Sequence, residues 1–357
     1  MRKKIVVCGG GTGGHVFPAV TFTEFFKEKD YETILITDER GKKFLKKDFV
    51  NYRIINVSQA TKSDIVSKII FYIKLLPSFI NSLFLLKEEK PQVIFGLGGY
   101  VSFPICMAAK FLNIKILLYE PNIVLGRVNK FFVNYCDKLF TNSKNIINLP
   151  EKNFHKCIKV GNILRGEILK YQSPEKNYLK KSRTIIILGG SQSAEIFGET
   201  IPDVIVELSK NFKIEVIQQT LPKQLNKIRD CYNNNKIENY VFNFHENILD
   251  LMVKADLAIS RCGASTMGEL EFLGIPFVAI PYPFAKDDHQ HHNALYYEKK
   301  GCCWILNQKN LNFSNLEKLL HNILNNKVEL STKRENMFKN DSKNSLLKIE
   351  REIKNII

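Results

Sequence analysis

The first motif able to do chemistry packs five glycines into the six positions from Gly9 to Gly14, with Thr12 among them. Glycine lets the backbone approach a bulky group, and the first N–H groups of a helix attract an anion or a sugar oxygen. The spacing also fits the GxGxxG pattern of dinucleotide binding, with Asp38 near the end of the second predicted strand. Alone, the motif leaves both interpretations open.

His15 follows this loop directly and stands where the predicted helix begins. The positive end of the helix dipole disfavours a charged imidazole, which leaves a neutral ring able to accept a proton. A general base is one hypothesis. The alternative is a histidine that only hydrogen-bonds the glycine loop.

Two further loops of small residues occur downstream, at Gly189–Ser193 and at Arg261–Glu269. The second opens a helix whose N–H groups are suited to hold a diphosphate. Glu269, one turn inside, is able to bind a ribose diol through its two oxygens. The competing interpretation is a capped helix with an exposed glutamate.

A histidine-rich run between His289 and His292 includes Gln290. Adjacent histidines on a helix or strand cannot all point at one ion, so a metal cluster is disfavoured. We expect some of these side chains, Gln290 above all, to hydrogen-bond sugar hydroxyls.

The elements that position these loops alternate between buried strands and helices. Strands are predicted in two series, at Lys4–Cys8, Thr33–Thr37, Gln92–Leu97 and Lys115–Tyr119, and then at Arg183–Leu188, Lys213–Gln218, Tyr240–Phe242, Leu257–Ser260 and Phe277–Ile280. Alternation of this kind predicts parallel, doubly wound sheets, so the fold class is α/β with two Rossmann-like domains. Leu346, Ile349, Ile353 and Ile356 form one apolar face of a last helix.

The composition indicates a globular protein of two domains, with 357 residues and a net charge of +16. No aromatic-basic module of a nucleic-acid binder is present, so we expect no nucleic-acid partner. The eight cysteines form no CxxC pair, and no cleavage-site pattern follows the start. We therefore expect a reduced, cytoplasmic protein.

Ile65 to Leu86 is the longest apolar stretch, but lysine, proline and asparagine interrupt it, so no transmembrane helix is predicted. It carries two apolar stripes: one contains Ile65, Ile69, Ile73, Leu76 and Ile80, and the other contains Phe71, Leu75 and Phe79. One stripe suffices for a core. The second, beside Lys62, Lys68, Lys74 and Lys87, indicates a surface that enters anionic headgroups, whereas a buried helical hairpin is the alternative.

Together, the motifs Gly10–Pro18, Gly98–Ser102, Gly189–Gln192 and Arg261–Glu269 with Asp288–Gln290 resemble the MurG family of glycosyltransferases over nearly the whole chain. The resemblance implies a GT-B fold, with two doubly wound parallel-sheet domains facing a cleft. Residues 1–162 would form the acceptor and membrane-binding domain and 163–340 the UDP-sugar domain. Residues 341–357 would form a helix docking back on the first domain.

The family's reaction is transfer of N-acetylglucosamine, with inversion, from UDP-N-acetylglucosamine to undecaprenyl-pyrophosphoryl-muramyl-pentapeptide. This implies a peripheral enzyme of peptidoglycan synthesis at the cytoplasmic face of the inner membrane, with a part in cell shape and division. The expected partners are the UDP-sugar, the lipid-linked acceptor and an anionic membrane surface. No cofactor and no metal are implied, because helix N-termini and Arg165 can neutralise the leaving diphosphate.

The resemblance also implies a role for each matching residue. His15 is the family's candidate for general base, and Thr12, Gly13, Gly14 and Asn122 would face the reacting sugar and acceptor. The donor would be held by Arg165 and Ser191, by Ala264, Ser265 and Thr266 at the diphosphate, by Glu269 at the ribose, by Gln290 at the sugar and by the backbone of His245 at the uracil.

Three departures from the family pattern concern loop geometry. They are Tyr119-Glu120-Pro121-Asn122, Gly161-Asn162-Ile163-Leu164-Arg165 and Ser193. Two other functions remain as alternatives. One is a UDP-sugar-dependent transferase acting on another glycolipid, and the other is a membrane scaffold that binds a nucleotide sugar without turnover.

Overall fold

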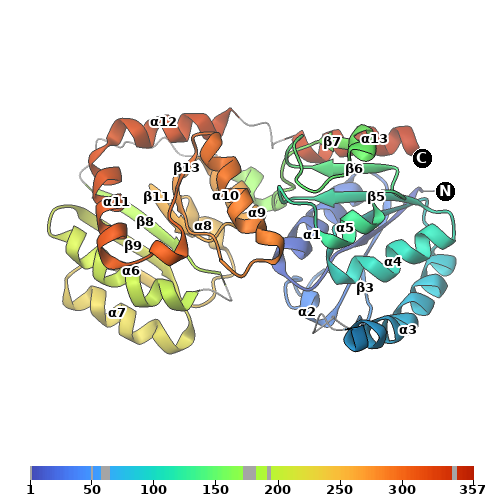
Figure 1. Ribbon diagram of the computed structural model, residues 1–357, viewed down its shortest axis with the longest axis horizontal. Helices are drawn as coiled ribbons and strands as arrows, with labels where there is room; N and C mark the ends of the chain where they lie inside the picture. Colours follow the sequence, from blue (N-terminus) through green and yellow to red (C-terminus); the bar gives the residue numbers. More distant parts are fainter. Residues whose placement is uncertain (1, 50, 58–64, 172–181, 191–193, 340–343) are drawn as a thin grey trace. The chain divides into compact units, whose positions relative to one another are not determined.

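The computed structural model describes residues 2–49, 51–57, 65–171, 182–190, 194–339 and 344–357, with side chains of the long helix α3 described from Leu75 onward. The chain divides into two compact units, Met1–Gly166 with Ser342–Ile357, and Glu167–Asp341 (Figure 1). The sequence-based boundary lies after Asn162, whereas the first unit extends to Gly166. Arg165 therefore belongs to the first unit.

The first unit is built on a parallel sheet with the strand order β3-β2-β1-β4-β5-β6-β7. Its strands are β1 (Lys4–Cys8), β2 (Glu32–Thr37), β3 (Tyr52–Ile54), β4 (Val93–Gly96), β5 (Lys115–Glu120), β6 (Lys138–Thr141) and β7 (Cys157–Lys159). The four predicted strands of this unit are confirmed. The short strands β3, β6 and β7 were not predicted, because three or four residues give too little apolar pattern.

Helices cover both faces of this sheet: α1 (Gly13–Glu28), α2 (Glu39–Lys42), α3 (Ile65–Glu89), α4 (Gly99–Phe111), α5 (Arg127–Phe132) and α13 (Ser345–Ile356). One core includes Val6, Ile94 and Ile105 and is covered by α3, α4 and α5. The other includes Phe22 and Phe95 and is covered by α1 and α13. Because both faces are buried, the central strands β1 and β4 are apolar apart from Lys4 at the start of β1.

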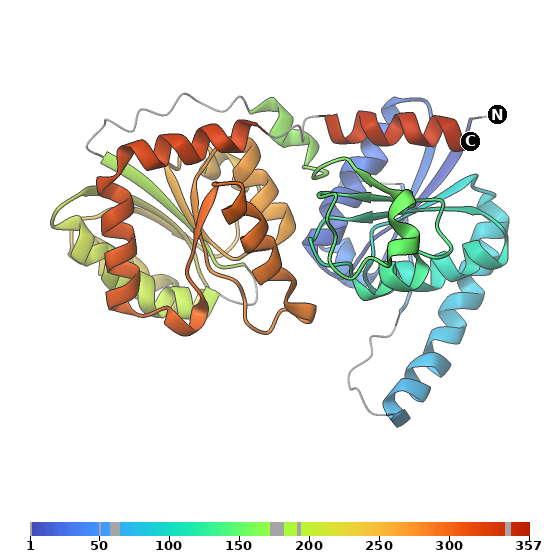
Figure 2. The same cartoon turned by 45° about the horizontal axis from the view of Figure 1, so that its top comes forward.

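The last helix, α13, packs on the first unit, where Figure 2 shows it in red on the same body as the blue β1 and α1. Ile349 and Ile353 are fully buried in the core beside α1, and Leu346 and Ile356 lie against it. The Ser345 hydroxyl donates a hydrogen bond to the carbonyl of Val160, 2.9 Å away. These contacts join the end of the chain to its first half.

The second unit has a parallel sheet with the order β10-β9-β8-β11-β12-β13. Its strands are β8 (Ser182–Leu188), β9 (Lys213–Gln219), β10 (Glu238–Phe242), β11 (Leu257–Ser260), β12 (Phe277–Ala279) and β13 (Cys303–Ile305). Its helices are α6 (Ala194–Ser209), α7 (Leu225–Asn234), α8 (Ile248–Met252), α9 (Ala264–Leu273), α10 (His289–Lys299), α11 (Phe313–Asn325) and α12 (Lys327–Phe338). The five predicted strands are confirmed, and β13 is an additional edge strand.

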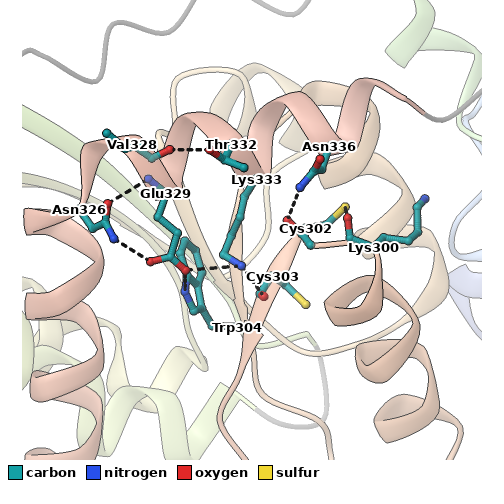
Figure 3. Close-up of polar contacts among 11 residues, drawn as sticks. Lys300, Cys302, Cys303, Trp304, Asn326, Val328, Glu329, Thr332, Lys333 and Asn336 are labelled. Atoms are coloured by element: carbon teal, nitrogen blue, oxygen red, sulfur yellow. Dashed lines mark hydrogen bonds and ion pairs between the residues drawn. The ribbon is translucent and has the colours of Figure 1, made fainter.

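Polar contacts fasten α12 to the edge strand β13 (Figure 3). The Trp304 indole N–H donates to Glu329 at 2.7 Å, and Lys333 donates to the carbonyl of Cys303 at 3.1 Å. The Lys333 ammonium also lies over the Trp304 ring, 4.4 Å from its centre. The strand that ends the sheet is thereby covered by a helix.

Two doubly wound parallel sheets confirm the predicted α/β, GT-B fold class. In the part of the chain that the structure describes, every helix is too short or too polar to cross a membrane.

Candidate functional site

The glycine loop between β1 and α1 is shaped mainly by the protein's own side chains. Thr12 is the N-cap of α1, and Gly11 has a φ of +80° that other residues rarely adopt. A Cβ on Gly10 would lie 2.6 Å from Val101, and one on Gly11 would lie 2.8 Å from the Tyr100 ring. Gly14 differs, because among the described residues a Cβ there would have only the Thr12 hydroxyl nearby, at 3.9 Å. Gly14 is therefore the least crowded glycine of this loop.

Asp38, at the end of β2, holds this loop in place. Its Oδ1 accepts hydrogen bonds from the backbone N–H of Gly11 at 2.8 Å and of Gly41 at 2.9 Å, and its Oδ2 accepts from the Tyr100 hydroxyl. Burial favours the protonated acid, but these hydrogen bonds outweigh it and leave the pKa of Asp38 below its ordinary value. Because both oxygens are engaged by the protein, the ribose contact that a dinucleotide site requires is disfavoured.

His15 lies in the first turn of α1, and its side chain is half-buried. Its imidazole stands against Gly99, where a Cβ would lie 3.3 Å from Cδ2 and 3.4 Å from Nε2. Gly98 and Gly99 have φ angles of +76° and +72°. Glycines at these two positions therefore let the loop after β4 form the wall beside the histidine.

Asn122, after β5, is oriented by the buried carboxylate of Glu120. Glu120 accepts from the Asn122 backbone N–H at 3.1 Å and from its side-chain amide at 3.0 Å. It also accepts from Gly126 and from the amide of Asn129, and it is only 2 % exposed. A Cβ on Gly98 would lie 3.2 Å from that Asn129 amide. The loop after β4, which stands beside His15, therefore also contacts the residues that surround Glu120.

Arg165 lies at the end of the first unit, beside α1. Its guanidinium lies 4.1 Å from the centre of the Phe17 ring. Phe17 in turn packs edge-on against Phe44 and fills the space where a Cβ on Gly13 would be. The structure thus associates Arg165 with the start of α1, in the unit opposite to the one predicted from sequence.

In the second unit, the N-terminus of α9 opens onto free space. Gly263 is its N-cap, a Cβ on Gly263 would meet none of the described residues within 4 Å, and Ala264, Ser265 and Thr266 form the first turn. Arg261 precedes this turn and is 6 % exposed, with its guanidinium donating to the carbonyls of Ile280 and Pro281 at 3.1 and 3.2 Å. Burial lowers the pKa of Arg261 to about 10. The N-terminus of a helix suits an anion.

Glu269 lies in the middle of α9 and is only 3 % exposed, so it is not the exposed glutamate of a capped helix. Gln290 lies in the first turn of α10, and its Oε1 contacts the loop that precedes α9 and the loop that follows β12. That oxygen accepts from the backbone N–H of Cys262 at 3.1 Å and of Tyr282 at 2.9 Å. The oxygen of Gln290 therefore supports the loop that precedes α9.

The histidines around Gln290 do not converge. His289 Nδ1 shares a hydrogen bond with the carbonyl of Lys286 at 2.7 Å, and the rings of His291 and His292 lie edge to face, 6.0 Å apart. Among the described residues, no group of three or more histidine, cysteine, aspartate or glutamate side chains is arranged to hold a metal ion.

His245 follows β10 and packs its ring edge-on against Tyr240 and Phe242. Ser191 lies outside the described residues. The predicted residues that the structure describes divide between the two units. The first contains Thr12, Gly13, Gly14, His15, Asn122 and Arg165, and the second contains His245, Ala264, Ser265, Thr266, Glu269 and Gln290.

The supporting residues Asp38, Tyr100, Glu120 and Arg261 were not predicted as parts of these groups. Asp38 and Glu120 carry one usable signal, because each is a carboxylate at the carboxyl end of a predicted strand, where ligands gather in open α/β sheets. Their partners are backbone N–H groups and the side chains of Tyr100, Asn122 and Asn129, and no local sequence pattern pairs them with the two carboxylates.

Family models match both units. The description "Glycosyltransferase family 28 N-terminal domain" matches residues 5–141, and "Glycosyltransferase family 28 C-terminal domain" matches residues 184–349. The two matches cover the β1–α1 loop, Asn122 and the α9 turn.

Relatives match along almost the whole chain. A protein of Pelagibacter ubique named UDP-N-acetylglucosamine--N-acetylmuramyl-(pentapeptide) pyrophosphoryl-undecaprenol N-acetylglucosamine transferase is 40 % identical, over 94 % of each chain. A protein of the same name from Rickettsia canadensis is 37 % identical, over 91 % of this chain and 92 % of its own. The crystal structure of Acinetobacter baumannii MurG has a TM-score of 0.80 and 22 % identity, over 99 % of both chains.

Proposed function

The chain belongs to glycosyltransferase family 28, and from this premise we propose that it transfers N-acetylglucosamine from UDP-N-acetylglucosamine to undecaprenyl-pyrophosphoryl-MurNAc-pentapeptide. The acceptor group is the muramyl hydroxyl, and the anomeric carbon inverts. The observation that carries the proposal is the 40 % identity, over 94 % of the chain, to a relative named for this transfer. The two groups of residues described above fit such a reaction.

The acceptor side of the reaction is assigned to the first unit. In one in-line displacement, the muramyl oxygen bonds to the anomeric carbon while the bond from that carbon to the UDP oxygen breaks. The hydroxyl proton must go to a base, and His15, half-buried against Gly99 in the first turn of α1, is assigned to this role. Asn122, held by Glu120, is assigned to the hydroxyls of the reacting sugar.

The donor side is assigned to the second unit. UDP leaves as a diphosphate, and the charge that develops on it needs preorganised donors. The N–H groups of the first turn of α9 and the hydroxyls of Ser265 and Thr266 are suited to this, and Arg261 adds a buried positive charge behind them. Glu269 is assigned to the ribose, Gln290 to the sugar and the His245 backbone to the uracil. Ser191 completes the proposed donor contacts of this unit, and Arg165, which belongs to the first unit, is proposed to contact the donor as well.

A surface of the first unit supports peripheral binding to the cytoplasmic face of the inner membrane. Leu76, Ile80 and Phe84 lie four residues apart on α3 and are 56, 42 and 68 % exposed. Phe111, 72 % exposed at the end of α4, lies 6.4 Å from Phe79 by ring centres. We name Leu76, Ile80, Phe84 and Phe111 the apolar patch.

The apolar patch corrects the assignment of the two stripes made from sequence. Leu75, expected on the lipid-facing stripe, is 7 % exposed and therefore faces the core, whereas Leu76 and Ile80 face outward. Phe71 lies in the part of α3 whose side chains are outside the description. Exposed lysines, Lys87 and Lys110, lie next to the patch in sequence and suit anionic headgroups.

Release of UDP is the test that separates the candidate functions. The protein is mixed with UDP-N-acetylglucosamine and one of three additions: the undecaprenyl-linked muramyl-pentapeptide, a glycolipid without the muramyl group, or no lipid. Release only with the muramyl lipid supports the proposal. Release with the other glycolipid would point to a different acceptor class, and donor binding without release would point to a scaffold. The expected consequence in the cell is a part in wall synthesis, and hence in shape and division.

A further inference from the structure

Asp38 joins three segments of the first unit that are far apart in sequence. Its carboxylate accepts from Gly11 in the loop after β1, from Gly41 in α2 and from Tyr100 at the start of α4. The residue is 6 % exposed, so water does not compete for these hydrogen bonds.

The backbone segments around Asp38 are closely packed. A Cβ on Gly10 would lie 2.7 Å from the Asp38 carboxylate, and one on Gly41 would lie 3.2 Å from Cα of Gly10. The Tyr100 ring covers Gly11 as closely. The glycine loop is therefore packed from two sides, by Asp38 and by Tyr100.

Tyr100 extends this arrangement to His15. It directly follows Gly99, the residue against which the His15 imidazole stands. The Ser102 hydroxyl, in the first turn of α4, donates to the carbonyl of Gly98 at 2.7 Å and to that of Cys8 at 2.9 Å. These bonds fix the loop after β4 to the end of β1. The wall beside His15 and the turn that carries His15 thus share Asp38 as a common anchor.

A simple helix cap does not account for these contacts. Asp38 is the N-cap of α2, and that role uses the Gly41 N–H alone. The same oxygen also binds Gly11, and the second oxygen binds Tyr100, neither of which belongs to α2.

We propose that Asp38 and Tyr100 are positioning residues for the transfer reaction, which fix the glycine loop against the loop after β4 and so set the place of His15. The inference rests on the proposed function, because that function gives His15 its role. Neither residue needs to touch a substrate for this effect.

Tyr100→Phe is the decisive variant, because it removes the hydroxyl and keeps the ring. We expect kcat to fall roughly tenfold or more, since a hydrogen bond to a charged group is lost, while the KM for UDP-N-acetylglucosamine stays within about twofold. Backbone amides between Gly9 and Phe17 should exchange hydrogen faster in the free protein. A Tyr100→Phe variant with kcat within about twofold of wild type and unchanged exchange would overturn the proposal.

Variants of Asp38 provide the second test of the proposal. Asp38→Ala should lower kcat more than Tyr100→Phe, and Asp38→Asn should recover part of the loss because it keeps one acceptor oxygen. Tyr100→Phe added to Asp38→Ala should lower kcat by less than about twofold further, since the two residues act through one contact. Independent, additive losses would contradict the shared anchor.

Tyr232→Phe is the matched control. The Tyr232 hydroxyl is fully buried in the second unit and donates to Gln218 at 2.6 Å. Its loss should lower the melting temperature and leave kcat and exchange between Gly9 and Phe17 unchanged. If the wild-type protein shows no transfer, the proposed function fails, and the exchange comparison alone then decides the role of Asp38 and Tyr100.

Discussion

Buried carboxylates support the residues of the first unit that we assign to the reaction. Glu120, 2 % exposed, accepts from Asn122, Gly126 and Asn129, and Asp38, 6 % exposed, anchors the glycine loop. Each carboxylate accepts several N–H or O–H groups, the arrangement in which a buried charge is stabilised. The groups assigned to substrate are therefore placed by residues that a substrate does not reach.

His15→Ala is the first test at the scale of single residues. As the proposed general base, His15 should contribute about 10² to 10⁴ in rate, while the donor is assigned mainly to the other unit. We therefore expect kcat to fall by that factor with UDP affinity nearly unchanged, measured by steady-state kinetics and calorimetry. Turnover close to wild type would leave His15 as a histidine that only packs against Gly99.

Glu269→Gln is the second test at this scale. The variant keeps the volume of a residue that is 3 % exposed but removes the charge proposed to hold the ribose. Loss of a charged hydrogen bond predicts UDP binding weaker by roughly tenfold or more, measured by calorimetry.

Glu271→Gln is its matched control on the same helix. Glu271 is 2 % exposed and pairs with Lys300, so the control should destabilise the fold without affecting UDP affinity. Equal effects of both variants on UDP binding would refute the ribose assignment.

At the scale of elements, the apolar patch on α3 and α4 predicts binding to anionic vesicles that weakens as salt rises. Leu76→Ser with Phe84→Ser should reduce that binding without unfolding, because the side chains are 56 and 68 % exposed. Figure 2 shows α3 extending beyond the rest of its unit. Vesicle flotation and circular dichroism measure the two effects.

The control for the apolar patch is Phe313→Ser with Val328→Ser, two exposed apolar residues of the second unit. It should leave vesicle binding unchanged. If the patch variant binds vesicles as wild type does, or unfolds, the patch is not the membrane contact.

The helix α12 gives a prediction of stability. Lys333, with a side chain 13 % exposed, donates to Cys303 and lies over Trp304 (Figure 3). Lys333→Ala should therefore lower the free energy of unfolding by about 1–3 kcal/mol, measured with urea. Lys327→Ala, at an exposed position of the same helix, should change it by less than about 0.5 kcal/mol. Equal values would mean that the contacts of Lys333 do not hold α12.

The elements were largely predictable from sequence, whereas the supports of the site were not. Apolar runs such as Ile5–Val7 and glycine turns define strands and helix starts locally. The face that a helix buries depends on its neighbours. For this reason Leu75 was wrongly expected to face lipid, whereas the structure buries it and exposes Leu76 and Ile80. The contacts of Asp38 with Gly11 and Tyr100 span 27 and 62 residues, a distance at which local patterns carry no information.

For the whole molecule, the central chemical prediction is that transfer needs no divalent metal. The diphosphate is assigned to the N–H groups of α9, with the buried charge of Arg261 behind them. Activity on a soluble acceptor should therefore persist in excess EDTA. Complete loss, restored by magnesium or manganese, would mean that Asp287, Asp288 and the neighbouring histidines act as ligands.

The most direct measurement follows labelled N-acetylglucosamine from UDP to lipid. The full-length protein is incubated with the labelled donor and the undecaprenyl-linked muramyl-pentapeptide, and the lipid product is analysed for label and for the configuration of the new bond. The account predicts one labelled sugar on each muramyl group, with β configuration because the α-linked donor inverts, and a His15→Ala sample nearly devoid of product. Label that stays with UDP, or that reaches the lipid with α configuration, would contradict it.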